Sequence, residues 1–460
     1  MGSVSRKISP YHWDDSLPIS PARVTSFEIL RRIEKDKSFA TELLHSKAPT
    51  SLSARDYRLA TELVLGVLRN QKLLDWYLSR FSKIILEKLD SEVKVALRLG
   101  AYQMLMLSRV PPRAALHESV ELVSTSRIKS AKGFVNAVLR RIKRDEFQQA
   151  LQTLSLESIY GLSVRYSHPE WLVQRWVDCF DPNTLIQILE ENNRPPRTFF
   201  RLNTATLSRS ALWKELTSCG IEFSASSLCE DILELKNGDL NQTALMREHK
   251  IAIQDAGSQV IPHLLDPEEA DVCLDLCAAP GGKTSQLAQM TSGIARIFAV
   301  EAHWHRVRIM KSLHGDNWRN LYFTVADGTR PLPFSIAFDK ILIDAPCSGT
   351  GTLRRHPEIR WKLLPSDLAT LSQLQSALLE RAAGYLKPGG LVVYSTCSLE
   401  PEENEQVIEA FLAKNPQFQL ELPSDERFAR FFDLHRYFRL LPTDSDGFFA
   451  AMLRKTAGRR

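Results

Sequence analysis

Apolar residues recur at helical spacing throughout the first third of the chain. Between residues 22 and 146, leucine, valine, isoleucine and phenylalanine return every three or four positions, with charged residues between them. This is the pattern of helices that bury one face against a shared core. Ser53 precedes one such segment at a position suited to a helix cap. One stripe consists of Val24, Phe27, Leu30 and Ile33. The pattern predicts an all-α domain over residues 1–150.

The apolar pattern becomes mixed in residues 151–250. Pro169 stands at a position suited to the first turn of a helix. Residues 198–203 then alternate between apolar and polar as a strand does. The mixture predicts a small α+β module that links two larger domains.

From residue 251 to the end, short apolar runs alternate with longer amphipathic stretches. This rhythm is typical of a Rossmann-like α/β domain, a parallel sheet with helices on both faces. Gly447–Leu453 is predicted to be a last strand at the sheet edge. Ligands of such sheets bind beyond the carboxyl ends of the strands. The predicted parallel strands are Val272–Leu276, Arg296–Val300, Leu321–Val325, Lys340–Ile343 and Leu391–Tyr394.

Composition narrows the class of protein. The chain is 44% hydrophobic and 25% charged, which is typical of globular proteins. Met1–Lys7 lacks the apolar segment of a signal peptide, and we expect no membrane span and a cytoplasmic protein. The seven cysteines include no Cys-x-x-Cys pair, so we expect reduced thiols and no structural metal. His303 and His305 have no partner at ligand spacing and are interpreted as ordinary residues at a helix start.

The charge is distributed unevenly along the chain. Residues 1–150 carry 26 Lys and Arg against 16 Asp and Glu, whereas the remaining residues carry 33 against 38. One interpretation is that the basic part meets a polyanion such as RNA while the rest performs chemistry. The other interpretation is a solvated basic surface on the helices.

A loop of small residues, Ala278–Thr284, follows the first strand of the predicted parallel sheet. Such a loop lets backbone N–H groups approach a ligand, and the helix that follows favours a negative group. Cys277 stands where a triphosphate-binding loop needs glycine, which argues against triphosphate. Glu301 and Asp327 end the next two strands and suit ribose hydroxyls and an adenine amino group. Either acid alone could be a solvated loop residue, but together they indicate an adenosine-type cofactor.

Two cysteines follow later strands of the predicted sheet. Cys347 and Cys397 each precede a predicted helix, whose N-terminus is expected to lower the thiol pKa and favour a nucleophilic thiolate. The alternative is a buried, inert thiol, which we expect for Cys179 and Cys273. The segment Arg354–Trp361 is predicted to contact phosphate and stack on bases, or to be an ordinary surface loop.

These motifs together resemble the Nol1/Nop2/Sun family of RNA cytosine-C5 methyltransferases, and they occur in family order. The all-α front resembles the NusB-like domain of the family's bacterial small-subunit (16S) rRNA enzymes. The resemblance covers roughly residues 20–455. The stretches that carry it include Asp56–Arg58, Gly133–Arg141, Asp275–Thr284, Asp344–Gly351, Arg354–Trp361 and Ser395–Asn404.

The resemblance implies a class I methyltransferase domain, S-adenosylmethionine as cofactor and 16S rRNA as substrate. Cys397 would add to C6 of cytosine, Cys347 would assist product release, and Asp344 would hold N3. Glu301 stands where the family usually has Asp, so a shifted ribose is expected. The same chemistry on tRNA or 23S rRNA, or a non-catalytic RNA-binding or ribosome assembly factor, stays open as an alternative. We expect the protein to be a monomer. The expected cofactor residues are Cys277, Ala278, Ala279, Pro280, Gly281, Gly282, Lys283, Glu301, Asp327 and Asp344.

Overall fold

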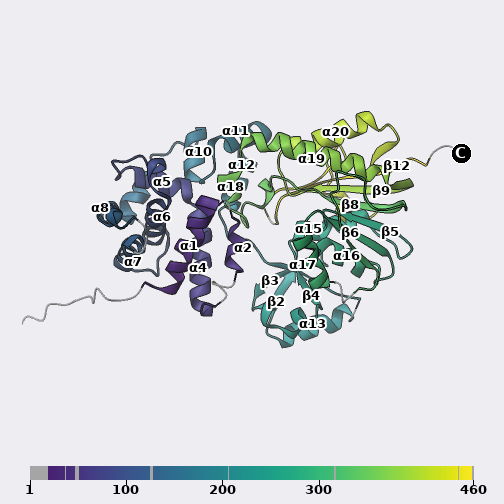
Figure 1. The fold of residues 1–460 in the computed structure, drawn as a ribbon, viewed down its shortest axis with the longest axis horizontal. Coiled ribbons are helices and arrows are strands. Elements are labelled where there is room, and N and C mark those ends of the chain that lie inside the picture. The colour runs from purple at the N-terminus through teal and green to yellow at the C-terminus, as the bar shows by residue number, and fades with distance from the viewer. Residues whose placement is uncertain are drawn as a thin grey trace, which may run out of the picture. The chain divides into compact units, whose positions relative to one another are not determined.

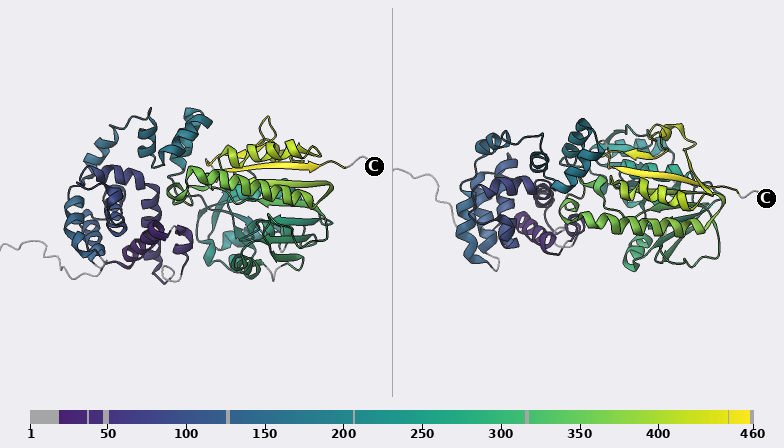
Figure 2. Two further views of the ribbon diagram at one scale, coloured as in Figure 1. Left: turned by 45° about the horizontal axis from the view of Figure 1, so that its top comes forward. Right: turned by 90° about the horizontal axis from the view of Figure 1, so that it is seen from above.

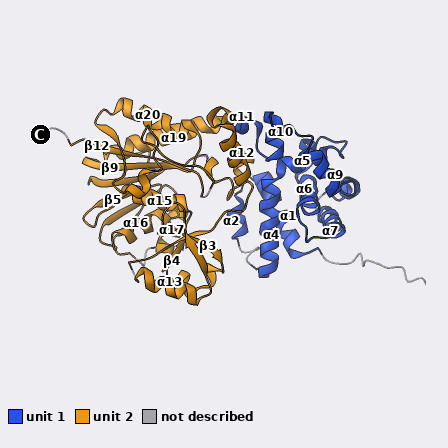
Figure 3. Cartoon of the chain, turned by 180° about the vertical axis from the view of Figure 1, so that it is seen from behind, with its two compact units in different colours: residues 1–173 blue, residues 174–460 orange. Residues whose placement is uncertain are grey.

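The structure is a computed structural model that describes residues 19–36, 38–46, 51–124, 128–205, 207–314, 318–443 and 445–457. The chain forms two compact units, residues 1–173 and 174–460 (Figure 3). Met1–Lys7, examined above for a signal peptide, lies outside the described residues. Within the described ranges, no helix has the length and apolar character needed to cross a membrane.

Every regular element described in the first unit is helical, as the apolar pattern predicted (Figure 1). The cap prediction is also confirmed, because Ser53 accepts a hydrogen bond from the Asp56 N–H. The predicted stripe of the first helix is wrong at Val24, which is 42% exposed. Buried α6 packs against α1, α4, α5, α7 and α8. The α-helices are α1 (Pro21–Asp36), α2 (Ala40–Leu44), α4 (Ala54–Arg69), α5 (Gln71–Ser79), α6 (Ser91–Met106), α7 (Pro112–Ser124), α8 (Lys132–Leu139), α9 (Arg144–Leu151) and α10 (Ile159–Arg165).

The middle of the chain contains the predicted α+β module. Its sheet is antiparallel, with strand order β2-β3-β1-β4, and Leu212 and Leu216 of α13 complete its core. The fourth strand lies beyond residue 250, within the segment that the sequence assigned to the next domain. The elements are α11 (Glu170–Cys179), α12 (Pro182–Glu191), β1 (Phe199–Leu202), α13 (Arg209–Ser218), β2 (Glu222–Ala225), β3 (Leu233–Asn237), α14 (Ala244–Arg247) and β4 (Ile251–Ile253).

The C-terminal part is built on an eight-stranded mixed sheet in the order β10-β12-β9-β8-β5-β6-β7, with β11 beside β12. The five predicted parallel strands are all present. The strand predicted for the edge is interior, because its continuous apolar run is covered on both faces and β10 pairs with its outer side. The strands are β5 (Val272–Leu276), β6 (Arg296–Glu301), β7 (Leu321–Val325), β8 (Phe338–Asp344), β9 (Leu386–Thr396), β10 (Phe418–Glu421), β11 (Phe438–Leu440) and β12 (Phe448–Lys455).

Helices cover both faces of this sheet (Figure 2). Side chains along the strands alternate between the two cores. Along β8, Ile341 and Ile343 pack toward α19 (Pro365–Gly384) and α20 (Glu405–Lys414), whereas Leu342 packs toward α15 and α16. The chain runs outward from β5 through β6 and β7, then returns to place β8 on the other side of β5. This reversal opens a crevice at the carboxyl ends of β5 and β8, where ligands bind in such sheets. The remaining helices are α15 (Ala256–Leu265), α16 (Gly282–Met290), α17 (Trp304–His314), α18 (Ile359–Lys362) and α21 (Glu426–Ala429).

Candidate active site

The loop Cys277–Lys283 after β5, called the ligand cradle below, has a backbone conformation that lets a ligand approach closely. Cys277 and Gly281 have positive φ values of 68° and 100°. A Cβ at Gly281 would lie 2.7 Å from a ring carbon of His314, so only glycine fits there. Gly281 caps α16, so the helix N-terminus faces the same loop. These features suit close approach of a ligand's negative group.

An ion pair connects Lys283, in the first turn of the helix after β5, to Asp344 at the end of the neighbouring strand β8. The Lys283 Nζ lies 2.6 Å from Asp344 Oδ2, and the Ser395 hydroxyl donates to the other carboxylate oxygen at 3.1 Å. The Asp344 side chain keeps 33% of its surface exposed, so it remains accessible to a ligand. A charge-assisted bond of this kind fixes the orientation of both groups.

Asp275 is buried beneath the loop and accepts a hydrogen bond from the Thr284 hydroxyl at 2.6 Å. Burial, assisted by the nearby charge of Asp344, raises the pKa of Asp275 to about 7. An aspartate in the unfolded chain titrates near 4. The folded state therefore holds the proton more tightly, and this contribution to stability is full below about pH 4 and lost as the pH rises through about 7.

Asp275→Asn is expected to flatten the pH dependence of stability. Between pH 5 and pH 8 the wild type should lose on the order of 2 kcal/mol from this carboxyl, and the variant should not. Thermal unfolding of both proteins at the two pH values measures the difference. Asp327→Asn is the matched control, since the Asp327 side chain is 48% exposed. Equal pH dependence in Asp275→Asn and wild type would contradict the prediction.

The acids after β6 and β7 lie in different environments. The Glu301 side chain is 4% exposed, and its two carboxylate oxygens contact His303 Nδ1 at 3.0 Å and the Arg306 guanidinium at 3.2 Å. A hydrogen bond from Thr329, together with the charge of Arg330, lowers the pKa of Asp327. His303 is therefore a partner of a predicted ligand residue, which its spacing alone did not indicate. A ribose bound at Glu301 would therefore share its carboxylate with His303 and Arg306.

The two thiols predicted from the sequence lie side by side. Cys347 Sγ and Cys397 Sγ are 3.3 Å apart, although the residues are 50 positions apart in the chain. The hydrogen bond with Cys397, together with burial and the charge of Glu403, raises the pKa of Cys347. The expected lowering by a helix N-terminus is therefore wrong for Cys347, because only a short 3₁₀ turn follows it. The buried environment expected for Cys273 is confirmed, whereas Cys179 is exposed.

Cys397 lines a pocket of about 340 Å³ together with Lys283 and Asp344. Cys347, Glu301 and Asp327 do not line this pocket, although the Cys347 sulfur contacts that of Cys397. An aromatic ring, a lysine and several carboxylates thus line the pocket together with the Cys397 thiol. The other lining residues are Ile253, Gln254, Asp255, Ser258, Ala345, Thr352, Arg355, Asp446 and Phe448.

Three of these residues form a charged cluster that the sequence did not reveal. The Arg355 guanidinium donates to Asp255 at 2.7 Å and to Asp446 at 2.6 Å. Burial and the charge of Asp255 raise the pKa of Asp446 to about 7. No spacing signal connects residues so far apart in the chain.

The prediction of phosphate contact is wrong for two arginines of the Arg354–Trp361 segment. Arg354 and Arg360 are each 1% exposed. Arg354 pairs with Glu191 at 2.6 Å, and Arg360 donates to the Asn192 carbonyl oxygen at 2.7 Å. Buried guanidinium groups require such partners. These two arginines therefore hold the loop in place.

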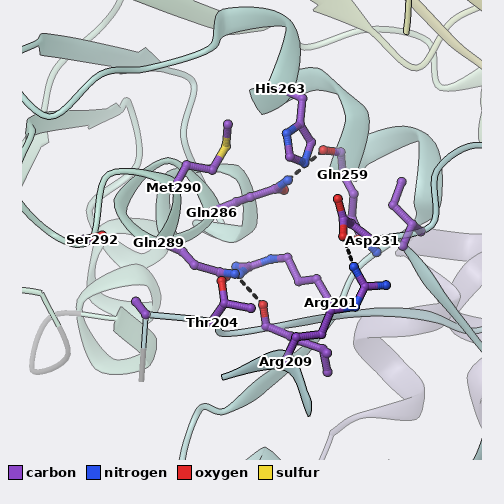
Figure 4. Close-up of a pocket in the computed structure, with 13 residues that line it drawn as sticks. Arg201, Thr204, Arg209, Asp231, Gln259, His263, Gln286, Gln289, Met290 and Ser292 are labelled. Carbon is purple, nitrogen blue, oxygen red and sulfur yellow. Dashed lines mark hydrogen bonds and ion pairs between the residues drawn. The ribbon is translucent and has the colours of Figure 1, made fainter. Parts of the chain in front are cut away.

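A second pocket, of about 330 Å³, lies between β1 and helices α15 and α16 (Figure 4). Arg201, which is 7% exposed, donates here to Gln254 at 2.9 Å, to Ser285 at 2.7 Å and to the Gly282 carbonyl oxygen. Burial lowers the pKa of Arg201 to about 10. Through these hydrogen bonds, Arg201 connects β1 of the middle module to the first turn of α16, the helix that follows the ligand cradle.

The domain architecture and the loop at the strand ends are those of a methyltransferase, and family comparisons agree. Residues 262–454 match the description "16S rRNA methyltransferase RsmB/F", residues 20–144 match "NusB family", and residues 168–240 match the ferredoxin-like domain of RsmF/B-like proteins. The crystal structure titled PH0851 has a TM-score of 0.79 and 26% identity, and the match covers 95% of this chain and 100% of that one. A methyltransferase homologue from Pyrococcus horikoshii has a TM-score of 0.57 and 31% identity, covering 66% and 100%.

Curated relatives extend the match to nearly the whole chain. The probable ribosomal RNA small subunit methyltransferase B of Bacillus subtilis is 33% identical, over 94% of this chain and 98% of the relative. The ribosomal RNA small subunit methyltransferase B of Klebsiella pneumoniae is 35% identical, over 84% and 88%. With this coverage, the chain belongs to the RsmB/F family of rRNA methyltransferases.

Proposed function

We propose that the protein methylates C5 of a cytosine in small-subunit rRNA through a covalent bond between Cys397 and C6. The observation that carries the proposal is the pair of sulfur atoms 3.3 Å apart at the pocket lined by Cys397. Cytosine C5 becomes nucleophilic only after a thiolate adds to C6, whereas transfer to an oxygen or nitrogen atom needs no thiol. A pair of thiols at this place therefore supports methyl transfer to a carbon atom rather than to oxygen or nitrogen.

Lys283, Asp344 and Phe448 would position the base for attack. Asp344 lines the pocket with Cys397, so its carboxyl group would hold a proton on N3 of the cytosine, and this proton would neutralise the negative charge that thiolate addition places on the ring. Lys283 at 2.6 Å keeps the carboxyl group in one orientation. The Phe448 ring lies 5.5 Å from the Lys283 ammonium and offers a surface for base stacking.

The ligand cradle fits S-adenosylmethionine, which supplies an electrophilic methyl group when bound. Residues Cys277–Lys283 would surround its amino-acid end, where the α16 N-terminus favours a carboxylate. Glu301 and Asp327 would accept hydrogen bonds from the ribose and the adenine amino group. These roles rest on where each residue lies at the strand ends.

Product release requires two bonds to break. After methyl transfer, C5 carries both the methyl group and a proton. A base removes that proton, the electron pair restores the C5–C6 double bond, and Cys397 leaves as a thiolate. Cys347 would assist, because its sulfur lies against the departing one.

RNA would contact the basic residues 1–150, as the charge asymmetry suggests, and also the module at 151–250. Such contacts would offset the cost of unstacking the target base, about a few kcal/mol.

The test is methylation of RNA by the purified protein with labelled S-adenosylmethionine, followed by bisulfite sequencing. Protein-free 16S rRNA, small-subunit particles, 23S rRNA and tRNA should be compared. One newly protected cytosine in 16S rRNA is the expected result. Protection only in tRNA or 23S rRNA would keep the chemistry and overturn the substrate. RNA binding without methylation would indicate an assembly factor instead.

A further inference from the structure

Glu403 is a fully buried carboxylate beneath the two cysteine loops. It ends the short turn Pro401–Glu403 that follows Cys397, and its relative exposure is 0%. The Tyr394 hydroxyl donates to its carbonyl oxygen at 2.6 Å, which fixes the residue to β9. A buried carboxylate is costly unless several donors satisfy it, so its partners indicate its role.

Glu403 is bonded to the residue that follows each thiol. Its Oε1 accepts hydrogen bonds from the Ser348 N–H at 2.8 Å and from the Gln375 amide at 2.9 Å. Its Oε2 accepts from the Ser398 hydroxyl at 2.5 Å and also from the Ser348 hydroxyl. The two serine hydroxyls are themselves 3.0 Å apart. One carboxylate thus connects the loop of Cys347 to the loop of Cys397.

The charge of Glu403 also acts on Cys347. All four of these donors are neutral, and they require an acceptor-only carboxylate. After the hydrogen bond with Cys397 and burial, the negative charge of Glu403 is a further cause that raises the pKa of Cys347. A thiol kept protonated beside Cys397 serves as a hydrogen-bond donor to a Cys397 thiolate.

We propose that Glu403 is a positioning residue, which holds the two cysteine loops, and with them the two sulfur atoms, in contact. The expected effect of Glu403 on catalysis rests on the function proposed above, whereas its expected effect on the two thiols does not. Without the carboxylate, the loops lose their common partner and the sulfur atoms separate. A displacement of about 1 Å at reacting groups reduces a rate by up to about 100-fold.

The test compares Glu403→Gln with Glu402→Gln. Glu402, the adjacent glutamate, is 31% exposed and pairs with Arg175 at 2.5 Å, away from both serines. Glu403→Gln is expected to lower kcat for RNA methylation by about 10- to 100-fold with KM changed by less than about threefold. Glu402→Gln should stay within about twofold of the wild type, as expected for a partly exposed ion pair.

Alkylation of Cys347 provides a readout that does not depend on methylation. In a Cys397→Ser background, mass spectrometry follows iodoacetamide labelling of Cys347 as a function of pH. Adding Glu403→Gln should shift the midpoint to lower pH by about one unit, because a nearby negative charge has been removed. Glu402→Gln should not shift it.

Ser398→Ala keeps the assay informative if Glu403→Gln fails to fold. It removes one donor at the Cys397 loop and should lower kcat by about threefold to tenfold without a change in KM. For Glu403→Gln, an unchanged kcat together with an unchanged alkylation midpoint of Cys347 would overturn the proposal. A shifted midpoint in a protein that methylates no RNA would leave this proposal standing and overturn the proposed reaction.

Discussion

Cys397→Ala is expected to abolish methyl transfer, with a loss of at least about 1,000-fold, as is usual when a catalytic nucleophile is removed. Cys397 is the thiol that lines the pocket with Lys283 and Asp344, so no other described sulfur can add to a base bound there. The variant should keep its RNA affinity, because the alanine removes only one side chain of the pocket. Label transfer to RNA and gel-shift binding measure the two properties.

Cys347→Ala should behave differently, although its sulfur lies only 3.3 Å from Cys397. Addition to C6 uses the neighbouring thiol, so the covalent bond should still form. Release should slow, and an RNA–protein adduct should accumulate on a denaturing gel. The double variant Cys347→Ala/Cys397→Ala is the control and should form no adduct. Adduct formation by Cys397→Ala, or equal behaviour of the two single variants, would contradict the roles assigned here.

Asp344→Asn is expected to produce the second large effect, a fall in kcat of about 100- to 1,000-fold, comparable to removal of one preorganised electrostatic group. The amide keeps the shape of the side chain but cannot form the ion pair with Lys283 or stabilise a proton at N3. Steady-state kinetics with saturating RNA separate the effect on kcat from the effect on KM.

Asp327→Asn is the matched comparison for Asp344→Asn. Asp327 lies at a strand end but does not line the pocket with Cys397, so its loss should raise the KM for S-adenosylmethionine and leave kcat nearly unchanged. If Asp344→Asn instead changed only the KM for S-adenosylmethionine, Asp344 would be a cofactor ligand without a part in base activation.

The sequence predicted the order and type of most elements because the relevant signals are local. Helical spacing marked the first unit, and five apolar runs marked the parallel strands with bounds close to those observed. The same local view misplaced the strand at Phe448–Lys455, since its place in the sheet is set by its pairing with β9 and β10, which no local pattern specifies. Strand pairing depends on segments that are distant in the chain.

Sequence motifs also identified most of the candidate site. The loop Cys277–Lys283 and the cysteines at 347 and 397 could be chosen because each follows a recognisable strand. By contrast, Arg354 and Arg360 could not be separated from a surface loop, because burial depends on Glu191 and Asn192 on another helix and the turn after it.

The sequence by itself therefore determined the class of fold, the cofactor-type loop and the identity of the two thiols. Only the tertiary structure decided that the thiols touch, that Glu403 connects their loops, and that Asp255 and Asp446, 191 positions apart, lie beside one arginine. The physical reason is the range of the interactions. Backbone preference and apolar periodicity act over a few residues, whereas hydrogen bonds and ion pairs join groups that only the folded sheet brings together.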